Sequence, residues 1–155
     1  MRRRGLPCVA GLDGILVDVM TPHERVLGFT NRWYGAALAS ARSHVLPDGT
    51  DILVAIAPVF LATKVEAFLG RGDGDFWASK DLEDVVTLVN GRPQLAREVA
   101  ETDEDLRRYL SKTLSKWLSD GDFGLVVAAH LEGDEESQQR AAVVLERLRS
   151  IAGSA

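Results

Sequence analysis

Cationic and acidic side chains gather around one glycine-rich stretch, ATKVEAFLGRGDGDFWASKDLEDVV. Lys64 and Arg71 are seven residues apart, close to two helical turns, so a helix would carry both cations on one stripe. In the segment that follows, Asp81 and Asp84 share a helical face, and Lys80 lies four residues before Asp84. Because cations bind phosphate and carboxylates bind divalent metal ions, the pattern is typical of a site for a polyanion.

A further carboxylate, Asp18, interrupts the apolar run ILVDV. Alternation along a strand places Ile15, Val17 and Val19 on one face and leaves Asp18 on the other, between apolar neighbours. A carboxylate in that position is costly without a partner. If the glycines of GRGDGD let the charged helices reach the end of this strand, Asp18 becomes the acidic metal ligand beside a cationic phosphate clamp.

Each of these features also has a structural interpretation. Lys64 and Arg71 fit the pattern of solvated charges on a helix surface. Asp81 and Glu83 fit the preference for acidic residues in the first turn of a helix. Asp18 fits a structural carboxylate held by a salt bridge. Spacing alone leaves both interpretations open.

The composition indicates one soluble, globular domain. A length of 155 residues suits a single core, and 46% hydrophobic with 26% charged residues excludes a largely disordered chain. The formal net charge of −5 gives no general attraction for nucleic acid, so phosphate binding must come from local cationic clusters. No run approaches the roughly 18 apolar residues of a membrane span. Cys8 is the only cysteine, which excludes an internal disulfide and fits the reducing cytoplasm, where we expect this protein.

Turn signals and hydrophobic periodicity predict a small sheet followed by helices. Short β-branched runs at 6–9 and 15–19, and two strands around the PDG turn at 47–49, predict about four strands, with a helix at 35–42. From Pro58 onward the spacing is helical. The expected helices are 58–71, 80–89 with Ser79 as N-cap, 93–101, 103–118, 123–131 and 135–151. The FGLVVAAHL segment at 123–131 fits a strand equally well.

In this order, the motifs DGILVDVM, LGFTNRWY, LPDGT, APVFLATKVEAFLGRG and SKDLEDVVTLVNGRP resemble the AbiEii/AbiGii-type nucleotidyltransferases, the enzymatic half of type IV toxin–antitoxin systems. The resemblance covers about 14–93 and extends more loosely into the C-terminal helices. It implies a polymerase-β-like fold that transfers a nucleoside monophosphate from an NTP, with Mg²⁺ held by carboxylates. It also implies tRNA or a protein as the acceptor and a cognate antitoxin as a partner.

The resemblance assigns roles to the charged residues selected above. Asp18 would be the third metal-binding carboxylate, and Lys64 would contact the nucleotide phosphates. The catalytic candidates are Asp18, Lys64 and Asp81. The nucleotide-binding candidates, which line the same cleft, are Lys64, Arg71, Lys80 and Asp84.

The sequence departs from the family upstream of VDVM. Family members carry there a Gly-Ser element and an Asp-x-Asp pair, which supply the first two carboxylates, and residues 1–17 contain neither. Two metal ions need more carboxylate oxygens than Asp18 alone supplies. The chain therefore looks like the C-terminal two-thirds of such an enzyme, and we expect little or no catalysis from it alone.

These observations predict an α+β protein: a truncated nucleotidyltransferase with a small mixed sheet at 5–57 and a helical bundle at 58–152, within one domain over 1–155. The expected function is impaired transfer of NMP from an NTP in a toxin–antitoxin or phage-defence setting. The alternative is an inactive module that binds a nucleotide or a partner and self-associates through an exposed sheet edge. A purely structural helical domain is a third interpretation.

Overall fold

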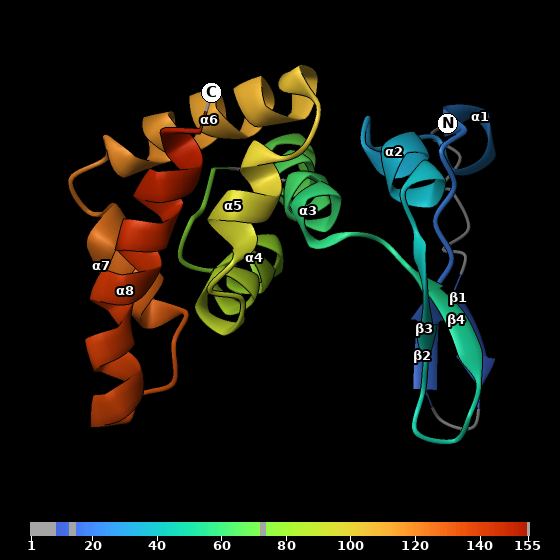
Figure 1. The fold of residues 1–155 in the computed structure, drawn as a ribbon, viewed down its shortest axis with the longest axis horizontal. Helices are drawn as coiled ribbons and strands as arrows, with labels where there is room; N and C mark the ends of the chain where they lie inside the picture. The colour runs from blue at the N-terminus through green and yellow to red at the C-terminus, as the bar shows by residue number, and fades with distance from the viewer. Residues whose placement is uncertain (1–8, 13–14, 72–73, 155) are drawn as a thin grey trace, which may run out of the picture.

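The computed structural model describes residues 9–12, 15–71 and 74–154, and of these it gives only the backbone for 9–12, 15–18, 27 and 71. Two hairpins and two short helices precede a bundle of longer helices (Figure 1). Within the described ranges, no helix combines the length and the apolar character needed to cross a bilayer.

The strands form two separate antiparallel hairpins. β1 (Val9–Leu12) pairs with β2 (Ile15–Asp18), and β3 (Arg42–Val45) pairs with β4 (Asp51–Val54). The expectation of a single mixed sheet is therefore wrong. Each strand pairs with its neighbour in the sequence, and within the described residues no ladder joins the two hairpins. Residues 6–8 of the first expected strand lie outside the described part.

The β3–β4 turn follows its sequence closely. Gly49 has a φ of 86°, a left-handed conformation that glycine adopts without a steric penalty. The Asp48 carboxylate accepts a hydrogen bond from the Thr50 amide at 2.9 Å, which is the usual role of aspartate in a turn. The turn fixes the strand register, which pairs Arg42 with Val54 and Val45 with Asp51.

Two short helices, α1 (Glu24–Leu27) and α2 (Tyr34–Ala39), lie between the hairpins. α2 ends three residues before its predicted end, because Arg42 already belongs to β3 and pairs with β4. The sequence did not predict a helix at α1. Its single turn ends at Gly28, which has a φ of 78°.

Six helices form the second half of the chain, as the sequence predicted. They are α3 (Ala57–Arg71), α4 (Lys80–Gly91), α5 (Leu95–Ala100), α6 (Glu104–Leu118), α7 (Phe123–Ala129) and α8 (Glu135–Ala152). The helical interpretation of the ambiguous FGLVVAAHL segment is confirmed. Three side-chain N-caps, Ser79, Asp103 and Asp134, each accept a hydrogen bond from the amide three residues later.

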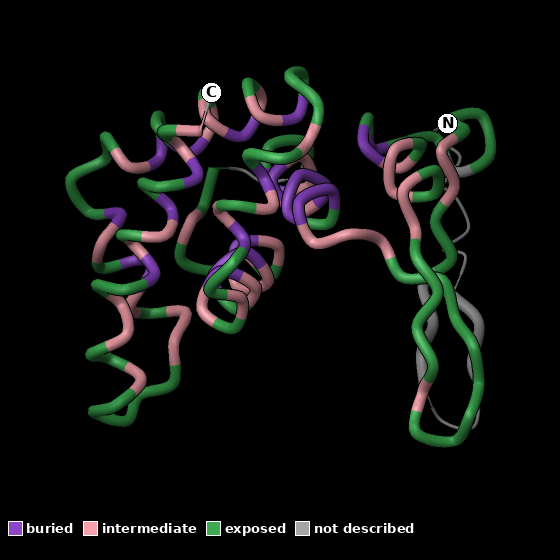
Figure 2. Tube along the Cα trace, viewed as in Figure 1, coloured by how far each residue is buried: buried purple, intermediate pink, exposed green. Residues whose placement is uncertain are grey.

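The hydrophobic core lies in this helical half (Figure 2). α8 packs against α4, α5, α6 and α7, so it closes the bundle. Arg147 of α8 also donates hydrogen bonds to the carbonyls of Val89 and Asn90, at 2.9 and 2.7 Å. Those carbonyls belong to the last turn of α4, where carbonyl groups have no hydrogen-bond donor within the helix. Apart from Trp33, every buried apolar side chain in the described part comes from residues 59–151.

A short segment before α2 attaches the hairpin half to the bundle. The Asn31 side chain is buried, donates a hydrogen bond to the Thr63 carbonyl at 2.7 Å and accepts one from the Trp33 amide at 3.0 Å. The Trp33 ring is buried 5.1 Å from the ring of Tyr109 on α6. The TNRW sequence is therefore an anchor that joins residues before α2 to α3 and α6.

Candidate functional site

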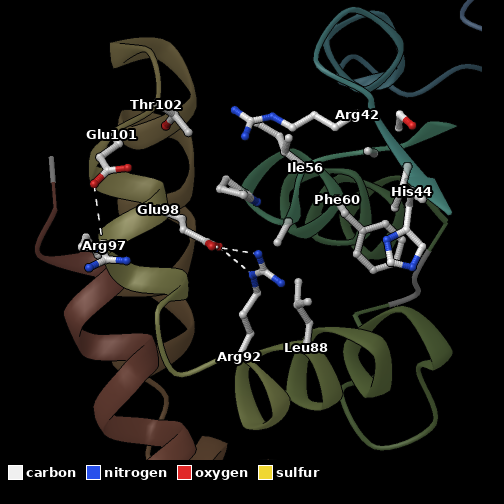
Figure 3. A pocket seen from close by; sticks show the side chains of 15 residues that line it. Arg42, His44, Ile56, Phe60, Leu88, Arg92, Arg97, Glu98, Glu101 and Thr102 are labelled. Atoms are coloured by element: carbon white, nitrogen blue, oxygen red, sulfur yellow. Dashed lines mark hydrogen bonds and ion pairs between the residues drawn. The ribbon is translucent and has the colours of Figure 1, made fainter.

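The largest hollow that we describe lies between the β3–β4 hairpin and the helical bundle (Figure 3). We call it the junction pocket. Its volume is about 720 Å³, within the ~300–1,000 Å³ of typical small-molecule sites. Its walls come from β3, the end of β4, the start of α3, α4 and α5. Binding sites often form at such junctions between parts of a chain.

The bundle side of the junction pocket carries paired charges. Arg92 donates two hydrogen bonds to the Glu98 carboxylate, at 2.7 and 2.8 Å, in the bidentate geometry that guanidinium and carboxylate groups favour. This bond raises the pKa of Arg92 further, so the guanidinium stays charged. Arg97 lies 3.9 Å from Glu101 in a looser, exposed pair. Each cation on this wall therefore already has a carboxylate.

The hairpin side of the junction pocket contributes a cation without such a partner. Arg42 extends from β3 across the pocket toward the α5 wall (Figure 3). Among the described residues, no carboxylate forms an ion pair with its guanidinium, and the side chain is exposed. The pocket thus holds three arginines against two glutamates, and Arg42 provides the excess positive charge.

Apolar and aromatic side chains cover the rest of the pocket wall. Ile56, Leu88 and Phe60 are apolar, and His44 adds an imidazole to the same pocket (Figure 3). A planar ring packs well against such a surface, while the arginine binds an anionic group. The arrangement suits a ligand that has an apolar or aromatic body and a phosphate or carboxylate.

The structure brings together three of the residues selected from the sequence. The Lys64 ammonium on α3 lies 2.5 Å from Asp84 and 3.7 Å from Asp81, both on α4. The side chains of Lys64 and Asp81 are only 26% and 15% exposed, so two carboxylates neutralise a half-buried cation. The ammonium lies 5.5 Å from the Phe60 ring, which places this ionic cluster next to the junction pocket without lining it.

Lys80 belongs to a different hollow. It lines a cavity of about 450 Å³ together with Trp77, Glu83 and His130. Its ammonium forms an ion pair with Glu83 at 2.9 Å, and its side chain is 89% exposed. The structure therefore separates Lys80 from Lys64, although α4 carries both Lys80 and the carboxylates that pair with Lys64.

Two further candidates fall where side chains are not described. Asp18 ends β2, with its Cα opposite that of Val9, and Arg71 ends α3. The structure describes the backbone of these two residues and not their side chains. The metal-binding role of Asp18 and the phosphate-binding role of Arg71 stay predictions.

The Mg²⁺ implied by the resemblance needs several oxygen ligands in one place. Among the described side chains, no group of three or more His, Cys, Asp or Glu residues could hold a metal ion. The nearest approach to such a group, Asp81 with Asp84, is shared with the Lys64 ammonium. These side chains do not fit a Mg²⁺ ion, and Mg²⁺ binding at Asp18 stays a prediction.

Sequence reasoning missed the residues that line the junction pocket. Arg42, Phe60, Arg92 and Glu98 come from four different segments, so no local spacing connects them. Arg42 was expected at the end of a helix. Only Arg92, next to Pro93, and Glu98, within α5, form a pair that their opposite charges could have indicated.

Comparison with known proteins adds no relative, since no family model, curated protein or solved structure matches the chain.

Proposed function

We propose that this chain binds a nucleotide in the junction pocket and is a nucleotidyltransferase-like protein with little or no catalysis on its own. The observation that carries the proposal is Arg42, a cation without a carboxylate partner among the described residues, which extends across a pocket of nucleotide size. A guanidinium binds phosphate oxygens in a bidentate geometry and keeps its charge at every physiological pH.

The other pocket walls support a nucleotide rather than a bare anion. Phe60 and His44 present rings, and Ile56 and Leu88 present apolar surface, on which a nucleobase can pack. In this arrangement Arg42 takes the phosphate-binding role that the sequence assigned to Lys64. Lys64 is a poorer choice because Asp81 and Asp84 already neutralise it.

Transfer of NMP to tRNA or to a protein acceptor, in a toxin–antitoxin or phage-defence setting, is the wider proposal that the sequence resemblance supports. An antitoxin partner belongs to the same proposal. The described side chains supply no metal-binding group for this transfer, so we expect binding without efficient turnover.

Isothermal titration with ATP, GTP, CTP and UTP, each with and without Mg²⁺, tests nucleotide binding. We expect Arg42→Gln to weaken binding by about tenfold to a hundredfold, because a hydrogen bond to a charged group contributes about 1.5–3 kcal/mol. Arg149→Gln is the matched control, since Arg149 is an exposed arginine of α8 outside the pocket. Lys64→Gln should leave the affinity within about twofold of the parent.

Two results would contradict the proposal. Equal affinities for the parent and Arg42→Gln would remove the junction pocket from nucleotide binding. Loss of binding in Lys64→Gln alone would move the site to the ionic cluster of α3 and α4. Label transfer from NTP to bulk tRNA or protein tests the wider proposal separately, and efficient transfer by this chain would overturn the expectation of weak catalysis.

A further inference from the structure

Both strands of the β3–β4 hairpin are exposed along their whole length, unlike the helical bundle (Figure 2). The strand register places Arg42, His44, Ile52 and Val54 on the face that borders the junction pocket. The opposite face carries Ser43, Val45, Asp51 and Leu53, of which Val45 and Leu53 are 62% and 75% exposed. An isolated two-stranded hairpin with exposed apolar side chains has little stability of its own.

The outer edge of β4 is also open. Within the described part of the chain, β4 forms hydrogen bonds with β3 alone. Leu46 donates a backbone hydrogen bond to Thr50, and alternation along an antiparallel pair then leaves Leu53 in a pair without hydrogen bonds to β3. The amide and carbonyl of Leu53 therefore point to the open edge.

The open edge of β4 carries no lysine, no proline and no charge in the middle of the strand. Proteins commonly protect such edges with lysine, proline or a charge in the middle of the strand. β4 reads Asp-Ile-Leu-Val, and its only charge is Asp51 at the first position. By contrast, β3 carries Arg42 and His44. The β4 edge is therefore the less protected of the two.

The sequence of β4 complements itself in an antiparallel arrangement. A two-fold axis at Leu53 sets Leu53 opposite its own equivalent, with Ile52 opposite Val54. Asp51 then faces Ala55 of the other copy, so the two aspartates lie at opposite ends and do not repel each other. The outward amide and carbonyl of Leu53 are the groups that a central hydrogen-bonded pair requires.

We propose that β4 pairs with the β4 strand of a second copy of this chain. The two hairpins then form one four-stranded antiparallel sheet, in the order β3–β4–β4–β3. This sheet buries the open edges and sets the two Leu53 side chains against each other on its outer face, with Ser43 of each copy beside Leu53. Such a sheet exceeds the three strands that independent stability usually needs.

Light scattering after gel filtration, from micromolar to millimolar chain concentration, measures the predicted dimer. Leu53→Lys should give a monomer, because it places two like charges at the two-fold axis. Leu53→Pro should do the same, because proline removes the amide at the open edge and leaves the bonds to β3 in place. Leu125→Lys is the matched control: Leu125 is a 63% exposed leucine on α7, and this variant should stay dimeric.

Cross-linking tests the register. In a Cys8→Ser background, which removes the only natural cysteine, Leu53→Cys should form a disulfide between two chains on mild oxidation. Paired residues of this kind have Cα atoms about 5.5 Å apart, which suits a disulfide. Val45→Cys lies one strand further from the axis and should stay reduced.

A monomer at every concentration would overturn the proposal and leave the edge for a strand of a different protein. A dimer that survives Leu53→Lys would also overturn it, because the contact would then lie elsewhere. Equal cross-linking through residues 45 and 53 would contradict the two-fold axis at Leu53.

Discussion

The hydroxyl of Tyr109 donates a hydrogen bond to the Glu66 carboxylate at 2.7 Å and joins α6 to α3. Burial, and then this bond, raise the pKa of the Tyr109 phenol well above its usual value. Since the folded protein holds this proton to a higher pH than the unfolded chain does, the contribution to stability is complete below about pH 10. It declines as the pH rises further toward the folded-state pKa.

We therefore expect Tyr109→Phe to reduce the loss of stability between about pH 9 and pH 11. At pH 7 the variant should be less stable by about 1 kcal/mol, because Glu66 loses its donor. Urea unfolding of the variant and the parent at each of these pH values measures the free energy of unfolding. Tyr34→Phe is the control, because Tyr34 is the only other tyrosine. The alkaline decline in stability of this variant should be as steep as in the parent. The same alkaline decline in Tyr109→Phe and the parent would contradict the prediction.

At the level of individual residues, the sequence predicted only some of the contacts. Helical spacing set Lys80 four residues before Asp84 as its expected partner, whereas Asp84 forms its ion pair with Lys64 and Lys80 pairs with Glu83. Spacing could not show that Asp81 and Asp84 leave Lys64 neutralised, because this depends on how closely α3 and α4 pack. It also could not assign Lys80 to the other hollow, since that wall includes His130, 50 residues away in the sequence.

Helix ends were the most predictable elements, because their determinants are local. Asp134 accepts a hydrogen bond from the Ser137 amide at 3.0 Å and caps α8. Hydrogen bonds from the side chain and the backbone of Ser137 lower the pKa of Asp134. A lowered folded-state pKa means that the contribution to stability is present above the ordinary carboxyl range and is lost as the pH falls through the folded-state value.

Asp134→Ala should therefore lower the thermal unfolding midpoint at pH 7, and the difference from the parent should shrink below about pH 4. Asp134→Ser provides the comparison, because serine also caps helices but carries no charge. Its midpoint at pH 7 should lie close to that of the parent. A difference between Asp134→Ala and the parent that stays constant down to pH 3 would argue against a contribution from the ionised cap.

The sequence predicted the strands as elements, but it wrongly joined them into a single mixed sheet. The PDG turn fixed β3 and β4 because its geometry depends on three adjacent residues. Which strands pair beyond the hairpin depends on contacts between distant segments. The helix predicted at 35–42 ended early for the same reason: strand pairing with Val54 draws Arg42 into β3. Because Arg42 belongs to β3 and not to the end of a helix, it lines the junction pocket.

Among the described residues, the anchor at Asn31 and Trp33 ties the hairpin half to the bundle. The bundle has its own core, to which the first half contributes only the Trp33 side chain among the buried apolar residues described. The junction pocket therefore depends on this anchor, because its two sides belong to the two halves. No local sequence pattern could have shown this dependence, since the anchor contacts Thr63 and Tyr109.

We predict that Trp33→Ala releases the hairpin half while the bundle stays folded. Limited proteolysis should then cut between 40 and 56 at a rate at least tenfold above that of the parent, and leave a resistant fragment that begins near Ala57. Helical circular dichroism should persist. Trp77→Ala is the control, because Trp77 is 55% exposed and lies outside the anchor. Cooperative loss of all helical signal in Trp33→Ala would contradict two separable halves.

The place of α8 in the bundle has a consequence for how the protein is made. α8 contacts four earlier helices and binds the last carbonyls of α4 through Arg147. A ribosome adds roughly 5–20 residues per second, so the contacts of these helices with α8 form only after the last part of the chain has been made. Until then the buried faces of α6 and α7 stay accessible to chaperones, and a message interrupted before Glu135 would yield an aggregation-prone product.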